Sequence, residues 1–311
     1  MNDHLLTDLT VVTVDAQMRV LENAGVAVRD GRIAWVGRMS DLPATLAPLP
    51  RLSPPGRVLT PGFVNVHTHA ILSMVRGVAQ DLVFAPAYTP GIPHGHDVRP
   101  DEAVALARLG AAKALLFGST LVNDTYAHAD LTLPAMAGSG GRVFNCGRIH
   151  DADFSLVGDG RWEHHDAIGE RTLGTDNMHA DMVEVMRWAL AIGRIQEDGV
   201  DDFWQTQHVL RMATLGGAEA MGLADRIGSI EVGKQADLVA FDFRRPQLVP
   251  CVNPVGSLVH TAQGRDVEHV WVDGRQVVAS GRPTQVDLDA ILADAQRAAD
   301  ALWRRAREGG V

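Results

Sequence analysis

The stretch that decides the fold is PGFVNVHTHAILSMVRG, residues 61–77. It opens with a turn and an apolar run typical of a buried strand, and that strand ends in His67-Thr68-His69. Because alternate residues of a strand point to the same side, the imidazoles of His67 and His69 are aimed at one point. Two converging neutral imidazoles form half of a zinc or iron site, but an isolated pair of histidines on an exposed strand would show the same spacing.

Strands and helices alternate over the middle of the chain. Apolar and β-branched runs that end in polar residues predict the strands, and apolar residues at helical spacing predict the helices. The predicted strands are 61–69, 119–126, 141–150 and 172–177, and the predicted helices are 101–118, 179–196 and two pieces within 201–223. This α/β alternation is typical of a (β/α) TIM-type barrel, whose chemistry lies at the carboxyl ends of the strands.

The two ends of the chain show a different pattern, in which short apolar strands are separated by turns. Asp30-Gly31 and Asp273-Gly274 sit where a type I′ hairpin requires residues that tolerate positive φ. Neither end has enough strands to bury a face alone, so we expect both to contribute to one small composite β-sandwich. The predicted domains are the sandwich at 1–59 and 227–285, the barrel at 60–226, and a C-terminal helix within 286–311 that Asp287 caps.

Composition excludes several classes of function. The formal net charge of −10 argues against a nucleic-acid partner and against an anionic membrane surface. Apolar runs stay shorter than the roughly 18–20 residues that cross a bilayer, and the first ten residues lack the features of a secretory signal. The chain has two cysteines, Cys146 and Cys251, too few for a disulfide framework. A cytoplasmic location is therefore expected.

The stretch at 61–77 resembles the entry motif of the amidohydrolase superfamily, in particular the branch of aminohydrolases and chlorohydrolases that act on nucleobases, adenosine-like compounds and s-triazines. The same branch shares GTDN followed by a helix of the type DMVEVMR, here Gly174 to Arg187, and a closing GSIEVGKQADLVAFD, here Gly228 to Asp242. The resemblance covers the sandwich, the first three barrel strands, the last one and the C-terminal helices. It implies a metal-dependent enzyme that deaminates or dechlorinates a small nitrogen heterocycle through a metal-bound hydroxide.

The resemblance also implies roles for individual residues. His67 and His69 match the metal ligands of the first strand, and Asp176 matches the aspartate of the last strand, which binds the metal and accepts the proton of its water. Asp176 could instead be the N-cap of the 179–196 helix. His150, at the end of the third strand, is expected to contact the substrate, with a surface-loop histidine as the alternative. The expected cofactor is one divalent metal, zinc in preference to iron.

The lysine count favours the one-metal deaminase branch. Cyclic-amide hydrolases of this superfamily usually bridge two metals with a carbamylated lysine on the fourth strand. This chain has two lysines, Lys113 inside a predicted helix and Lys234 in a predicted sandwich turn, and neither position suits that role.

The sequence departs from the family between Ile149 and Gly174. The family has four strands there, with a ligand histidine, a general-acid glutamate and another histidine, and none has a counterpart here. The predicted barrel is therefore incomplete, with an apparent internal gap near 158–173. Open edges of a partial barrel leave unpaired backbone groups. Three explanations are open: a lost internal stretch, which is favoured and predicts a chain break there; a shortened homologue whose second copy completes the wall as a homo-oligomer; and a catalytically inactive scaffold that oligomerises.

Overall fold

The computed structural model of the protein describes residues 3–52, 55–78, 91–145, 172–176, 179–196, 199–200 and 203–308. Two predictions lie outside the described residues, namely the substrate contact of His150 and nearly all of the apparent gap at 158–173. Within the described part of the chain, every helix is too short or too polar to span a bilayer.

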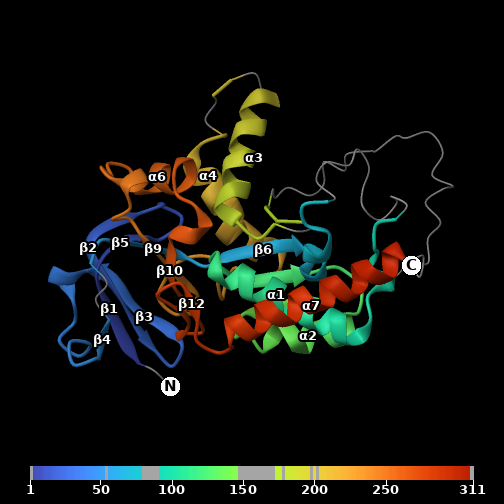
Figure 1. Ribbon diagram of the computed structural model, residues 1–311. Coiled ribbons are helices and arrows are strands. Elements are labelled where there is room, and N and C mark those ends of the chain that lie inside the picture. The colour runs from blue at the N-terminus through green and yellow to red at the C-terminus, as the bar shows by residue number, and fades with distance from the viewer. Residues whose placement is uncertain are drawn as a thin grey trace.

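A nine-stranded sheet brings both ends of the chain together (Figure 1). Its strands follow the order β12-β11-β10-β9-β5-β1-β2-β3, and β4 pairs with β1. The junction is β5, which runs parallel to β1 on one side and antiparallel to β9 on the other. The bounds are β1 His4–Val12, β2 Val20–Arg29, β3 Arg32–Arg38, β4 Arg51–Leu52, β5 Arg57–Pro61, β9 Leu238–Asp242, β10 Val267–Val272, β11 Arg275–Ala279 and β12 Arg282–Pro283.

The two predicted hairpin turns are confirmed. Asp30 and Gly31 have φ of 49° and 77°, and Asp273 and Gly274 have φ of 50° and 69°, as a type I′ turn requires. The two turns also touch each other, because a Cβ added to Gly31 would lie 2.7 Å from the backbone oxygen of Asp273. In the C-terminal part of the sheet, regular pairing starts at Leu238, the first residue of β9.

The second sheet has three parallel strands, β6 (Phe63–Thr68), β7 (Ser119–Asp124) and β8 (Arg142–Asn145), in that order. The predicted strand over 172–177 is reduced to a single parallel bridge between Thr68 and Asp176. That bridge places residues 172–176 beside β6, on the side away from β7. The described elements are those expected next to the seam between the first and last strands of a parallel barrel.

Helices cover the parallel strands from two sides (Figure 1). The first group packs an apolar core on η2, the 3₁₀ segment Ala70–Val75 that follows the histidine pair. The second group shares its core with β9 and β10. The first group is α1 (Pro100–Leu116), α2 (Ala129–Ala137) and α7 (Leu288–Arg307), and the second is α3 (Met182–Gln196), α4 (Thr206–Arg211) and α6 (Pro254–His260). Between α4 and β9 the chain continues helically through η6 (Met212–Gly216) into α5 (Gly217–Ala220).

Helix α7 begins as predicted, since Asp287 accepts hydrogen bonds from the backbone nitrogens of Asp289 and Ala290 at 3.0 and 3.1 Å. Near its other end, the Trp303 indole donates to the backbone oxygen of Met74 at 2.8 Å. Arg305 pairs with the buried carboxylate of Glu102 in α1. The last helix is therefore fastened to the segment that carries the histidine pair.

Candidate metal centre

Three predicted ligands meet at one point. The Nε2 atoms of His67 and His69 lie 3.3 and 3.1 Å from the same carboxylate oxygen, Oδ1 of Asp176. The two imidazole rings are 4.8 Å apart, centroid to centroid, and stand edge to face. His69 is mostly covered, whereas the side chains of His67 and Asp176 are 49% and 64% exposed, so the point where they meet is open to solvent.

Backbone pairing explains how residues more than a hundred positions apart converge. The amide of Asp176 donates to the oxygen of His67 at 3.0 Å, and the amide of His69 donates to the oxygen of Asp176 at 2.8 Å. Gly174 permits this approach, because a Cβ there would lie 2.8 Å from Cβ, N and O of His67. The glycine of the GTDN motif is therefore required by the close contact of the two segments.

A buried polar network fixes the register of the two segments. The Asn65 amide donates to Thr175 Oγ1 at 2.8 Å, and the Thr175 backbone amide donates back to Asn65 Oδ1 at 3.1 Å. Thr175 Oγ1 lies a further 3.3 Å from Thr68 Oγ1. All three residues are less than 10% exposed. Sequence reasoning missed this network. The sequence feature that could have indicated it is the presence of Asn65 and Thr68 inside an otherwise apolar strand.

The alternative role of Asp176 as a helix N-cap is wrong. Helix α3 begins at Met182, and Asp181 caps it by accepting hydrogen bonds from the backbone nitrogens of Val183 and Glu184 at 2.9 and 3.2 Å. Asp176 instead has a left-handed backbone with φ of 56°, an uncommon conformation for a residue other than glycine. Its side chain does not cap the helix and instead contacts both histidines.

Further residues surround His69. Thr125 Oγ1 lies 3.4 Å from His69 Nδ1, and the Tyr126 ring packs 4.9 Å from the imidazole, centroid to centroid. Contacts of this kind orient a ligating histidine and leave Nε2 for the metal. These neighbours follow directly after β7, so the second strand supports the predicted ligands of the first.

Asp124, the last residue of β7, is a buried carboxylate that sequence reasoning did not single out. Burial raises its pKa, against the opposing effects of the Ala70 amide, which donates to it at 2.9 Å, and of the two histidines. Asn145, at the end of β8, donates to its other oxygen at 3.2 Å. The signal available in the sequence was the position of Asp124 at the carboxyl end of a predicted barrel strand.

The geometry of the three donors fits a zinc ion. Zinc binds imidazole nitrogen and carboxylate oxygen at about 2.0–2.2 Å in tetrahedral sites, which sets neighbouring ligand atoms roughly 3.4 Å apart. The measured separations of 3.3 and 3.1 Å are close to that spacing. The hydrogen bond from His69 lowers the pKa of Asp176, so the carboxylate stays ionised at neutral pH.

The chain's two lysines lie elsewhere, as expected. Lys113 is within α1, and Lys234 donates to Ser229 Oγ in the turn before β9. Neither can bridge metals at this point.

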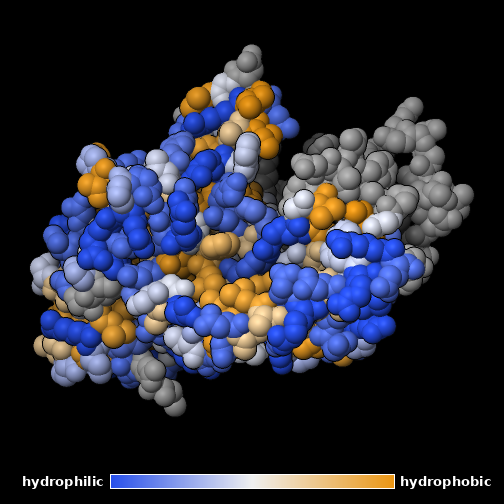
Figure 2. Space-filling view, in the orientation of Figure 1, coloured by the Kyte–Doolittle hydropathy of each residue, from blue (hydrophilic) through white to orange (hydrophobic). Residues whose placement is uncertain are grey.

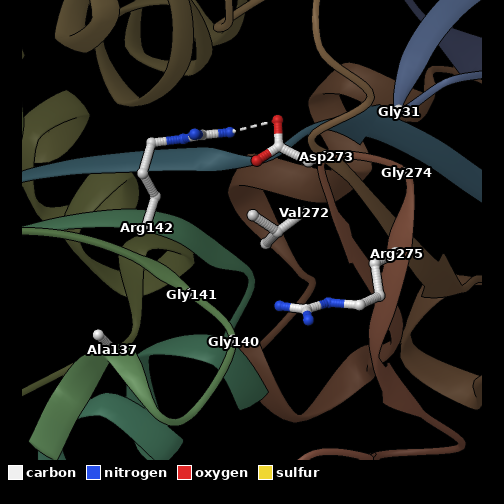
Figure 3. A pocket seen from close by; sticks show the side chains of 9 residues that line it. All are labelled: Gly31, Ala137, Gly140, Gly141, Arg142, Val272, Asp273, Gly274 and Arg275. Carbon is white, nitrogen blue, oxygen red and sulfur yellow. Dashed lines mark hydrogen bonds and ion pairs between the residues drawn. The ribbon is translucent and has the colours of Figure 1, made fainter. Parts of the chain in front are cut away.

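A separate cavity of about 510 Å³ lies between the loop after α2 and the Asp273-Gly274 turn (Figure 3). Arg142 reaches across it to Asp273, at 3.0 Å, and Arg275 points toward Gly140. Arg142 is the first residue of β8, so this cavity lies at the amino ends of the parallel strands. The histidines are at the carboxyl ends, and the cavity is therefore not part of the metal centre.

Comparison with known proteins places this geometry in context. The model of the amidohydrolase family matches residues 58–148 and 155–277, more than half of the chain. A 5-methylthioadenosine/S-adenosylhomocysteine deaminase of Syntrophobacter fumaroxidans is 46% identical over 84 residues, which are 27% of this chain and only 19% of that relative. The crystal structure of an adenosine deaminase from Xanthomonas campestris with bound zinc has a TM-score of 0.79 at 22% identity, covering 96% of this chain and 98% of that one, and shows a shared fold.

A relative matched along nearly its whole length shows that this chain is shorter. A deaminase of the same name from Nitratidesulfovibrio vulgaris, strain Miyazaki F, is 26% identical over 422 residues, covering 94% of this chain and 96% of the relative. Since the present chain has 311 residues, an alignment of 422 positions leaves more than a hundred positions of the relative without a counterpart. The resemblance inferred from the sequence motifs is confirmed.

Proposed function

Because the chain belongs to the amidohydrolase family, we propose that it is a metal-dependent hydrolase of C–N bonds other than peptide bonds. The reaction would be hydrolytic deamination of a nitrogen heterocycle, or displacement of a comparable leaving group such as chloride. The observation that carries the proposal is the convergence of two imidazole nitrogens on one oxygen of Asp176, at 3.3 and 3.1 Å. An inactive scaffold would not need this open arrangement of donors.

We assign the ligand roles to His67, His69 and Asp176, with zinc as the expected ion. When bound there, a divalent metal supplies a water of low pKa, which can attack the ring carbon near neutral pH. Thr125 and Tyr126 hold the His69 ring in place. Asn65 and Thr175 hold the two ligand-bearing segments in register.

We assign to Asp176 the transfer of a proton from the attacking water to the leaving nitrogen. Its pKa is lowered, so its carboxylate is ready to accept one proton from the attacking water. Returning that proton to the leaving nitrogen releases ammonia and leaves an oxygen on the ring carbon, so atoms and charge balance.

The substrate class rests on similarity. The two relatives described above carry names of deaminases acting on 5-methylthioadenosine and S-adenosylhomocysteine. We therefore propose an aminated purine or a similar heterocycle as the substrate. The contact of His150 with that substrate and the cytoplasmic location stay predictions.

Metal content and turnover test the proposal together. The purified protein should retain about one zinc at the centre and release ammonia from an adenosine-like substrate. His67→Ala and Asp176→Asn should each lose metal affinity and activity, whereas His208→Ala, which removes a half-buried histidine of α4 outside the centre, should retain both. Full metal binding by the His67→Ala variant, or no hydrolysis of any heterocyclic amine by the zinc-loaded protein, would overturn the assignment.

We also propose that the parallel strands belong to a shortened barrel beside a composite β-sandwich. The missing positions relative to the Nitratidesulfovibrio protein support this reading. So does the outer face of α3, where Trp188, Ile192 and Ile195 are 60%, 48% and 78% exposed, and where apolar residues gather at the tip of the helix in Figure 2. If a second copy completes the wall, the protein in solution should be a homo-oligomer, and Trp188→Glu should shift it toward the monomer in light-scattering measurements.

A further inference from the structure

A second group of possible ligands lies outside the centre described above. The turn His94-Gly95-His96-Asp97 precedes α1 and contains the 3₁₀ segment η4, Gly95–Asp97. One ligand atom from each of His94, His96 and Asp97 lies within 4.8 Å of the others. We propose that this turn is a second divalent-cation site, selective for ions that favour imidazole, such as Zn²⁺.

The spacing of the donors supports a metal. His94 Nδ1 lies 3.4 Å from Oδ2 of Asp97, and His96 Nε2 lies 3.4 Å from Oδ1 of the same carboxylate. A tetrahedral zinc site requires about 3.4 Å between neighbouring ligand atoms, given zinc–ligand bonds of about 2.1 Å. The two imidazole rings are stacked, with centroids 5.2 Å apart and planes at 20°. The His96 side chain is 80% exposed, so it can rotate to bring its nitrogen to bonding distance of an ion held by the other two residues. Solvent can supply the fourth ligand.

The turn is held in shape from three directions. The Asp97 carboxylate accepts a hydrogen bond from the His94 backbone amide at 2.7 Å. His128 Nε2 lies 2.9 Å from the oxygen of Gly95, and Arg305 donates to the oxygen of Asp97 at 3.2 Å. Arg305 also pairs with Glu102, so its positive charge is balanced and does not oppose a cation at the turn. A turn fixed in this way loses little conformational freedom when it binds an ion.

The side chain of Tyr126 lies between this turn and the first centre. Gly95 packs against Tyr126, since a Cβ at Gly95 would lie 2.5 Å from Cε1 of that ring. The same ring packs on His69 at 4.9 Å. A cation bound to the turn would therefore fix the position of Tyr126 and, through it, the orientation of a ligand histidine. The inference concerns binding alone and does not depend on the proposed hydrolytic activity.

Zinc stoichiometry tests the proposal. The full chain, dialysed against micromolar zinc and measured by elemental analysis, should hold two zinc ions, and His96→Ala should hold one. The double variant His67→Ala/His69→Ala should also hold one, and combining all three substitutions should leave none. His208→Ala is the matched control and should hold two.

Hydrogen exchange supplies a second readout that does not depend on turnover. Added zinc should slow exchange of the amides at 94–98 in the full chain and in His67→Ala/His69→Ala, but not in His96→Ala. One zinc in both the full chain and His96→Ala would overturn the second site, as would two zinc ions in both. A full chain that loses its zinc only with His96→Ala would refute the first centre while supporting the second.

Discussion

Gly174→Ala offers a strong test of how the proposed metal centre is built. The added methyl would lie 2.8 Å from three atoms of His67, whereas non-bonded carbon atoms prefer separations of about 3.5–4.0 Å. Residues 173–176 would have to move away from β6 by about 0.7 Å, and the overpacking should cost about 1–3 kcal/mol of unfolding free energy. Asp176 is two residues further on and must move with the segment.

That displacement is large on the scale of metal coordination. Ligand distances at a working site hold to within about 0.2 Å, so we expect zinc affinity to fall roughly 10- to 100-fold and turnover by about 100-fold. Zinc affinity would be measured by competition with a chromophoric chelator, turnover by ammonia release, and stability by urea unfolding. Gly138→Ala is the matched control, because its nearest neighbours would be 3.6 Å from the new Cβ and its φ is −59°. Zinc affinity in Gly174→Ala within twofold of the unaltered protein would refute the packing argument.

Three further predictions concern stability. Burial lowers the pKa of Lys113 to about 7 from 10.5, so the unfolded chain binds more protons between those values, and the free energy of unfolding should rise with pH there. Urea titrations should show this rise flattened in Lys113→Met, and an unchanged slope would contradict it. Leu302→Ala, at a fully buried position of α7, should cost about 2–5 kcal/mol, against less than about 0.5 for the half-exposed Leu292→Ala. Arg305→Met removes the ion-pair partner of the buried Glu102 carboxylate and should cost about 3 kcal/mol by calorimetry, with the loss reduced if Glu102→Gln is added.

The histidine pair shows what strand periodicity can predict. The convergence of His67 and His69 follows from alternation along one strand, a local property of the sequence. Asp176 came from the resemblance alone, since an aspartate ahead of a predicted helix is equally typical of an N-cap. Only the structure shows that the helix starts six residues later, at Met182.

The supporting residues could not be predicted in the same way. The contact between Asn65 and Thr175 depends on the register of two segments far apart in the chain, and no periodicity encodes that register. The same holds for Asp124, whose partners Ala70 and Asn145 come from neighbouring parts of the fold. Pattern reasoning predicted the two hairpin turns because glycine and aspartate at positive φ are required locally.

The segment before β9, residues 229–237, is not a regular strand for a related reason. These residues run as a connection whose backbone amides bond to separate places, such as Ile230 to Thr13 and Ala236 to Gly31. Tertiary contacts outweigh strand propensity there.

The direct backbone pairing of Thr68 with Asp176 has a consequence for how such a chain can change over time. The backbones of these two segments bond directly to each other, so the stretch between β8 and Leu173 enters this pairing as a tether between its two sides. The entropy of closing a tether grows slowly, by about 0.6 kcal/mol for each doubling of its length. Insertions or deletions between β8 and Leu173 therefore change the cost of assembling the centre very little. The length of this stretch can therefore change while the pairing that brings His67, His69 and Asp176 together is kept.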